Sequence, residues 1–170
     1  GRSAQAATRD WYSQRGVTGS IPFRGGIAAL TVAGTISGWG AAHELSRKHL
    51  GGKLPISRLV ADAVYLATHG IPVTKSQANC TQVKLEELKD HIGFADTFLP
   101  AGQAPEAGGI FKQHRLADTL KAIAKDGCES FYRGKLAKSL AAELALAGSP
   151  LTLADLNAHQ AKLVDPLTTN

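Results

Sequence analysis

The sequence contains no methionine, only two cysteines and 6% aromatic residues. Cys80 and Cys128 belong to no C-x-x-C pattern, so we expect free, partly buried thiols rather than a disulfide framework or a cysteine zinc site. No apolar run approaches the ~20 residues that a membrane-spanning helix needs, and we expect no secretory signal peptide within these residues. Because position 1 is Gly1, we expect that it is not a translational start.

Charge is sparse and scattered along the chain. Charged residues make up 19% of the sequence and hydrophobic residues 44%, which is typical of a globular protein and not of a disordered one. The net charge of +5 is compatible with an anionic partner. However, the longest basic cluster is Arg47-Lys48-His49, and no aromatic residues alternate with it. We therefore interpret the basic residues as solvated helix surface and expect no nucleic-acid partner.

Short catalytic motifs are incomplete or missing. His43 begins an H-E-x-x-H zinc pattern, but Arg47 stands where the second histidine is needed, so we expect His43 to be a packed helix residue. Ile36 occupies the centre of a Gly-Thr-Ile-Ser-Gly run where a nucleophile elbow has serine. No G-x-x-x-x-G-K-[ST] phosphate loop occurs. Taken by themselves, the residues predict no self-contained catalytic site.

Hydrophobic spacing and glycine or proline stop signals predict a mostly α-helical chain. The clearest amphipathic segment runs from Pro55 to His69, and Thr74 and Thr152 have the spacing of N-terminal caps. We expect helices over 3–14, 37–49, 55–69 and 74–90, from 116 to a stop at 127, from 136 to a stop at 148, and from 152 onward. One or two short strands, one of them near 28–32, would need partners that the chain does not supply.

Two further segments stand out. Residues 93–113 are rich in proline and glycine, and we expect a flexible surface loop there, inside a single domain or part-domain covering 1–170. The run Phe131-Tyr132-Arg133-Gly134 lies between two amphipathic patterns. We interpret it as a helix–helix corner in which Phe131 and Tyr132 fill the core while Gly134 permits the turn.

The run Leu30–Trp39 reads Leu-Thr-Val-Ala-Gly-Thr-Ile-Ser-Gly-Trp, and its glycines let a short strand turn sharply into a helix. It resembles the T-V-P-G-T-V-S-G-W segment in the large subunit of the γ-glutamyltransferase (γ-glutamyltranspeptidase) family. Further segments resemble that family in the same order and spacing, at 54–73, 116–134 and 151–167. The chain departs from the family pattern at Ala33, where proline is usual, and at His114. Both departures concern turn chemistry.

The resemblance implies a mostly α-helical fragment of an α/β fold, the αββα sandwich of the N-terminal-nucleophile hydrolases. In that family a precursor cuts itself into a large and a small subunit. The N-terminal Thr of the small subunit, which this chain does not contain, then attacks γ-glutamyl amides such as glutathione, with its own α-amine as base. The γ-glutamyl group passes to water or to an amino-acid or peptide acceptor. The resemblance also implies that no metal or cofactor is needed and that the protein is periplasmic or secreted.

One substrate-binding residue follows from the resemblance. The family's large subunit supplies an arginine, just before an A-T-R-D-like segment, that binds the α-carboxylate of the donor. The segment Ala6–Asp10 matches, and Arg2 is the arginine nearest the expected place. A guanidinium suits this role because it grips a carboxylate with two parallel hydrogen bonds. The alternative is that Arg2 is a terminal residue without a role.

Two other functions stay open. One is a same-family amidohydrolase that cleaves a different amide, such as a cephalosporin side chain or poly-γ-glutamate; an acylase whose substrate lacks an amino-acid side chain does not need Arg2. The other is a non-catalytic helical binding domain, which the missing nucleophile favours. In the first hypothesis the partners are the small subunit with its Thr and a small γ-glutamyl substrate.

Overall fold

The computed structural model describes residues 2–168, so Gly1 and the question of the translational start lie outside the described part. Along the chain the elements are α1 (Arg9–Ser13), η1 (Gly26–Ala28), α2 (Thr35–His49), α3 (Ile56–Leu59), α4 (Ala61–His69), β1 (Ile71–Pro72), α5 (Lys75–Leu88), α6 (Phe94–Phe98), η2 (Pro100–Gly102), β2 (Ile110–Phe111), α7 (His114–Asp126), α8 (Ser130–Arg133), α9 (Lys135–Leu146) and α10 (Leu153–Asn157). The predicted helical character is confirmed. Of the helices within 2–168, none combines the length and the apolar character that crossing a membrane takes.

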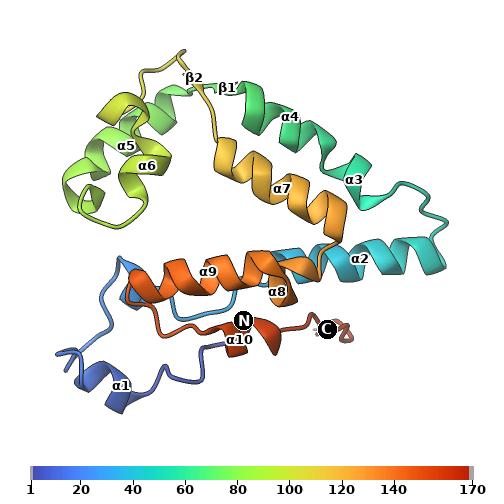
Figure 1. Ribbon diagram of the computed structural model, residues 1–170, viewed down its shortest axis with the longest axis horizontal. Helices are drawn as coiled ribbons and strands as arrows, with labels where there is room; N and C mark the ends of the chain where they lie inside the picture. Colours follow the sequence, from blue (N-terminus) through green and yellow to red (C-terminus); the bar gives the residue numbers. More distant parts are fainter. Residues whose placement is uncertain (1, 169–170) are drawn as a thin grey trace.

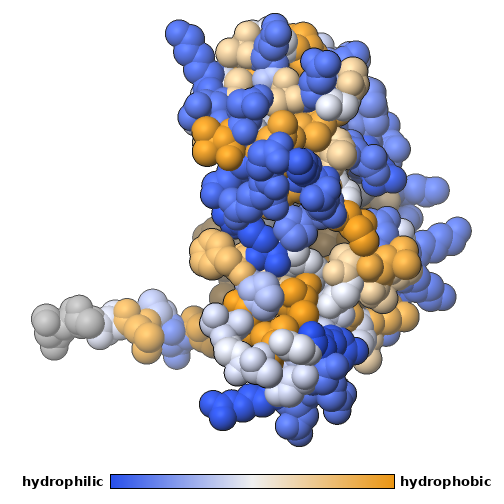
Figure 2. Space-filling view, turned by 90° about the vertical axis from the view of Figure 1, so that its left-hand side faces the viewer, coloured by the Kyte–Doolittle hydropathy of each residue, from blue (hydrophilic) through white to orange (hydrophobic). Residues whose placement is uncertain are grey.

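The elements form an upper and a lower layer (Figure 1). The upper layer runs from α3 to α7, and the lower layer holds α1, α2 and α8 to α10, with the start of the described chain beside α10. After α10 the chain leaves the body as a tail that carries exposed Leu163, Val164 and Leu167, and Figure 2 shows this tail projecting sideways.

The upper layer is built on the packing of α7 against α3 and α4. Ala117, Leu120 and Ile123 recur every third position of α7, so they share one face, and all three are buried. Gly127 ends this helix with a positive φ of 81°, a conformation that glycine adopts without strain. At the far end, the antiparallel pair β1–β2 joins Ile71 to Phe111 across the layer.

The lower layer has its own core around α8, α9 and α10. Tyr132 and Ala137 are fully buried and Leu156 is 2% exposed. The other buried members of this cluster are Ala4, Val32 and Leu151. Phe131 packs against the cluster, and a Cβ at Gly134 would lie 2.8 Å from the carbonyl oxygen of Ser130. The predicted helix–helix corner is thus confirmed.

The prediction of a helix over 3–14 is wrong in its first half. Only Arg9–Ser13 are helical, and the hydroxyl of Thr8 caps them by accepting a hydrogen bond from the Trp11 amide at 3.2 Å. Ser3 instead forms an antiparallel bridge with Thr31. The alanine-rich composition favours a helix, but pairing with a distant strand outweighs this weak preference. The prediction that short strands need partners outside the chain is therefore also wrong.

Other element boundaries move as well. The strand predicted near 28–32 is reduced to the bridge at Thr31, after the 3₁₀ turn η1. The helix predicted over 55–69 is interrupted at Val60, where α3 ends and α4 begins. The segment 93–113, expected as a loop, contains α6, η2 and β2. The cap at Thr74 is confirmed, since its hydroxyl accepts a hydrogen bond from the Gln77 amide at 3.0 Å.

Gly26 is the residue at which the loop before α2 touches α9. A Cβ at Gly26 would lie 1.9 Å from the carbonyl oxygen of Ala147, the C-cap residue of α9. The Ala147 carbonyl belongs to the backbone, so it cannot move aside as the end of a flexible side chain could. The close approach of η1 to the end of α9 therefore requires glycine at this position.

We expect Gly26→Ala to lower the free energy of unfolding by about 1–3 kcal/mol, the usual cost of overpacking. Gly19→Ala is the control, because a Cβ there meets no atom within 4 Å. Urea unfolding of both variants measures the difference. Equal stability of the two variants would show that η1 does not pack against Ala147.

Candidate functional site

Arg2 lies in an extended segment whose backbone is held by the chain that precedes α2. The amide of Val32 donates a hydrogen bond to the Arg2 carbonyl at 2.9 Å, and the amide of Ala4 donates to the Leu30 carbonyl at 2.8 Å. Together with the bridge between Ser3 and Thr31, these bonds form a short antiparallel ladder. The backbone at Arg2 is therefore ordered although it lies at the edge of the described residues.

The side chain of Arg2 is exposed and reaches the end of α10. Its Nη1 donates a hydrogen bond to the carbonyl of Ala158 at 3.1 Å. Among the described residues this is the only hydrogen bond that the guanidinium makes. A guanidinium carries several further N–H donors arranged in a plane. Arg2 can therefore bind a carboxylate while one of its nitrogens stays on α10.

Asp155 is the buried residue that ties α10 to the same segment. It is 2% exposed, and its Oδ1 accepts a hydrogen bond from the amide of Gln5 at 2.9 Å. Its Oδ2 accepts hydrogen bonds from the amide of Thr152 at 2.9 Å and from the Thr152 hydroxyl at 2.7 Å. The Thr152 hydroxyl in turn accepts from the Asp155 amide, which completes a capping box.

The surroundings of Asp155 favour its charged form. Burial raises the pKa of the carboxyl, but the hydrogen bonds from Gln5 and Thr152 and the nearby charge of Arg2 lower it by more. The pKa of Asp155 therefore lies below its ordinary value. A charged carboxylate accepts stronger hydrogen bonds than a neutral one, so the ionised form is the one that holds Gln5 in place.

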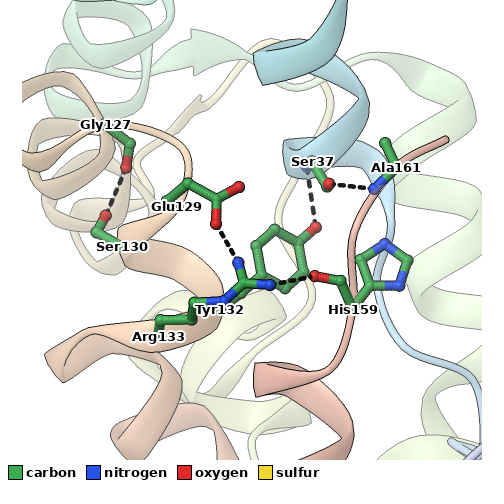
Figure 3. Close-up of polar contacts among 8 residues, drawn as sticks. All are labelled: Ser37, Gly127, Glu129, Ser130, Tyr132, Arg133, His159 and Ala161. Atoms are coloured by element: carbon green, nitrogen blue, oxygen red, sulfur yellow. Dashed lines mark hydrogen bonds and ion pairs between the residues drawn. The ribbon is translucent and has the colours of Figure 1, made fainter. Parts of the chain in front are cut away.

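A second buried group, Tyr132, orders the start of α2 (Figure 3). Its hydroxyl donates to the carbonyl of Ala33 at 2.6 Å and accepts from the amide of Ser37 at 3.0 Å. Burial raises the pKa of the Tyr132 phenol, and the hydrogen bond from Ser37 offsets part of this. The hydroxyl therefore keeps its proton at neutral pH and serves as donor and acceptor at once.

The residues after α10 close over this phenol. The ring of His159 tilts against that of Tyr132, with centroids 5.1 Å apart, and the Ser37 hydroxyl accepts from the Ala161 amide at 2.7 Å. Arg133 donates to the His159 carbonyl at 3.0 Å and pairs with Glu129 (Figure 3). Among the described residues, the buried Nε2 of His159 has no hydrogen-bond partner.

Other residues considered in the sequence lie away from this site or form no site. His43 is half-buried, and its Nε2 lies 2.8 Å from the Leu54 carbonyl oxygen, so it is a packed helix residue as predicted. Within residues 2–168, His, Cys, Asp and Glu side chains form no group of three or more that could hold a metal ion. Cys128 is a free, half-buried thiol as expected, whereas the free Cys80 is exposed.

The sequence predicted Arg2 as a candidate binding residue but did not predict most of its surroundings. The Thr-x-x-Asp spacing predicts only the cap at Thr152, because it is a local signal, and says nothing of a distant partner for Asp155. Its bond to Gln5 joins residues 150 positions apart, and the bond from Arg2 to Ala158 spans 156. No local pattern marks Gln5 or Ala158. The backbone groups that complete this site could be identified only in the fold.

We expect Tyr132→Phe to lower the free energy of unfolding by about 1–3 kcal/mol, because the amide of Ser37 and the carbonyl of Ala33 would lose a buried partner. Tyr65→Phe is the control, since Tyr65 is 61% exposed. Urea unfolding measures both. An equal and small effect of the two substitutions would contradict the anchoring role of Tyr132.

The pKa of Asp155 leads to a pH prediction. The pKa of Asp155 is lower in the folded state than its unfolded value of about 3.9. The carboxylate therefore stabilises the fold fully above the unfolded pKa, and this stabilisation is lost as the pH falls through the folded pKa. The Asp155→Asn variant has no carboxyl group at this position, so it does not titrate there. We expect the stability difference between the two proteins to shrink as pH falls from neutral to below the folded pKa. The measurement is the free energy of unfolding of both proteins across that pH range. A difference between them that does not change with pH would refute the prediction.

Comparison with known proteins relates the site to a family. The γ-glutamyltranspeptidase family model matches residues 1–170. The oxamate amidohydrolase proenzyme of Klebsiella pneumoniae is 52% identical over 169 residues, 99% of this chain and 31% of that protein. The glutathione hydrolase-like YwrD proenzyme of Bacillus subtilis is 34% identical over 170 residues, 100% of this chain and 31% of that protein.

A solved structure agrees. The cephalosporin acylase of Bacillus halodurans superposes with a TM-score of 0.87 at 31% identity, over 100% of this chain and 32% of that one. This chain thus spans 31% of the length of each of the two curated relatives. The chain belongs to the γ-glutamyltranspeptidase family, and its helices correspond to a part of that family's N-terminal-nucleophile hydrolase fold.

Proposed function

We propose that this chain is the part of an amide-hydrolysing enzyme that binds the carboxylate of the substrate, and that Arg2 is the residue that binds it. The observation that supports this most is the placement of Arg2. Its backbone is held in a ladder with residues 30–32, while its guanidinium is exposed and makes a single hydrogen bond to the described chain. An ordered backbone reduces the entropy lost when a ligand binds.

The proposed substrate is a small amide that carries a free carboxylate. The relative that is 52% identical to this chain is named an oxamate amidohydrolase, and in oxamate the amide carbonyl is joined directly to a carboxylate. The γ-glutamyl amides predicted from the sequence also carry a carboxylate, farther from the amide that is cut. Both suit Arg2, because a guanidinium recognises a carboxylate with two parallel hydrogen bonds. We propose oxamate-like amides first and γ-glutamyl amides second.

The proposed reaction is acyl transfer to water. Once Arg2 holds the carboxylate, the amide carbonyl is oriented toward the nucleophile. This orientation lowers the entropic cost of the attack. The nucleophile is the hydroxyl of a Thr that begins a second polypeptide. The C–O bond forms, the α-amine takes the hydroxyl proton, and this proton goes to the leaving nitrogen as the C–N bond breaks. Water then attacks the ester carbonyl, the α-amine takes a proton from it, and this proton goes to the Thr oxygen as the C–O bond of the ester breaks and the acid is released.

The second polypeptide is the proposed partner of this chain. Both curated relatives described above carry the word proenzyme in their names, which supports a precursor that is cut into subunits. In the complete protein the small subunit would bring its N-terminal Thr next to Arg2. The periplasmic or secreted location expected from the resemblance stays a prediction.

A cephalosporin-type acylase is the other candidate, and the fold similarity to such an enzyme supports it. The candidates differ in their need for Arg2, since an acylase whose substrate has no carboxylate near the cut amide does not use the guanidinium. A non-catalytic helical domain has less support, because the family match covers the whole chain.

We expect Arg2→Ala in the full-length processed protein to raise the KM for the carboxylate-bearing donor about 10- to 100-fold, the loss of a hydrogen-bonded ion pair worth about 1.5–3 kcal/mol. Arg2→Lys should recover only part of this, because a lysine ammonium cannot make the bidentate contact. Arg47→Ala, an exposed arginine in the last turn of α2, is the control. Initial rates with oxamate and with a γ-glutamyl anilide measure the effect.

The same preparation tests the partner. Intact mass and N-terminal sequencing should show a second chain that begins with Thr. A wild-type protein that is a single chain and turns over neither donor would refute the proposed function. A normal KM in Arg2→Ala with an active wild type would instead refute the role of Arg2 alone.

A further inference from the structure

We propose that Asp155 is a positioning residue for the carboxylate-binding Arg2, acting through the backbone of Gln5 and through α10. This inference rests on the proposed function, because it assigns the residue that holds the binding group in place. Asp155 touches no substrate in this proposal. It determines where the guanidinium of Arg2 stands.

The first support is the way in which Asp155 uses its two oxygens. Oδ2 makes the contacts of an ordinary capping box, to the amide and hydroxyl of Thr152. Oδ1 is not needed for the cap, and it accepts instead from the amide of Gln5 at 2.9 Å. One carboxylate thus joins the start of α10 to the segment that carries Arg2.

The second support is that α10 holds the Arg2 segment at both of its ends. Asp155, in the first turn, binds the backbone of Gln5, and the carbonyl of Ala158, at the C-cap, accepts from Nη1 of Arg2 at 3.1 Å. The carbonyls at a helix C-terminus carry partial negative charge, which suits a guanidinium. A displacement of α10 would therefore move both the side chain of Arg2 and the backbone at Gln5.

The third support is burial and charge. Asp155 is 2% exposed, whereas Thr152, the N-cap residue of the same capping box, is exposed. Capping alone does not require burial. Because both oxygens of Asp155 are occupied by Gln5 and Thr152, its charge acts on Arg2 through space without capturing the guanidinium. Arg2 is held near a negative charge and still has donors for a substrate.

The test uses the full-length processed enzyme and a matched pair of donors, oxamate and oxamide, in which an amide replaces the carboxylate. We expect Asp155→Asn to raise the KM for oxamate about 10-fold while kcat changes less than about 2-fold, because a misplaced arginine weakens a charged hydrogen bond. Turnover of oxamide should not change. In the double variant with Arg2→Ala, Asp155→Asn should add no further loss, since both substitutions act on one interaction.

Thr74→Ala is the control for stability alone, because it removes an N-terminal cap from a different helix, α5. It should lower the melting temperature and leave the KM for oxamate unchanged. If Asp155→Asn lowers the active fraction equally for both donors with a normal KM, or if its effect adds fully to that of Arg2→Ala, Asp155 is only a cap and the proposal is overturned.

Hydrogen exchange separates this inference from the proposed function. In Asp155→Asn the amide of Gln5 should exchange about 10-fold faster than in the wild type, since its acceptor loses its charge, while Thr74→Ala should leave it unchanged. If the wild type turns over neither donor, the proposed function fails. In that case fast exchange at Gln5 would still support the contact through which Asp155 holds the segment, and unchanged exchange would refute it.

Discussion

The hydroxyl of Tyr132 is the contact on which the lower layer depends, because it joins α8 to the start of α2 almost a hundred residues earlier. It accepts from the amide of Ser37, one of the first helical N–H groups that have no partner within the helix, and donates to the Ala33 carbonyl. Buried polar groups of this kind are costly when unpaired. A fully buried phenol is therefore stable here only if the chain before α2 returns to α8.

The short helix α10 is where the two ends of the described chain meet. A helix of five residues is not stable alone. Its capping box, the burial of Leu156 and the arginines at its C-terminal end hold it in place. Arg2 and Arg133 donate to the successive carbonyls of Ala158 and His159. The same contacts that stabilise α10 therefore present Arg2 at the surface, which links the packing of the lower layer to the substrate binding that we propose for Arg2.

Elements with local signals were predicted well. Helix α7 follows from apolar spacing and the stop at Gly127, and the caps of α5 and α10 follow from Thr-x-x-Gln and Thr-x-x-Asp. The helix expected over residues 3–14 failed because its first residues pair with Thr31 and its neighbours, which no local pattern reveals. The break at Val60 lies inside a continuous apolar pattern, so periodicity alone predicted one helix where α3 and α4 are separate.

The order of short motifs along the chain was enough to identify the family, and the spacing within a few residues was enough to place most helices and caps. These properties depend on neighbours along the chain. Only the tertiary structure decided that Asp155 accepts a hydrogen bond from the Gln5 amide in addition to capping its own helix, and that Arg2 donates a hydrogen bond to the end of α10. A hydrogen bond is directional and short, so partners more than a hundred residues apart are chosen only when packing brings them together.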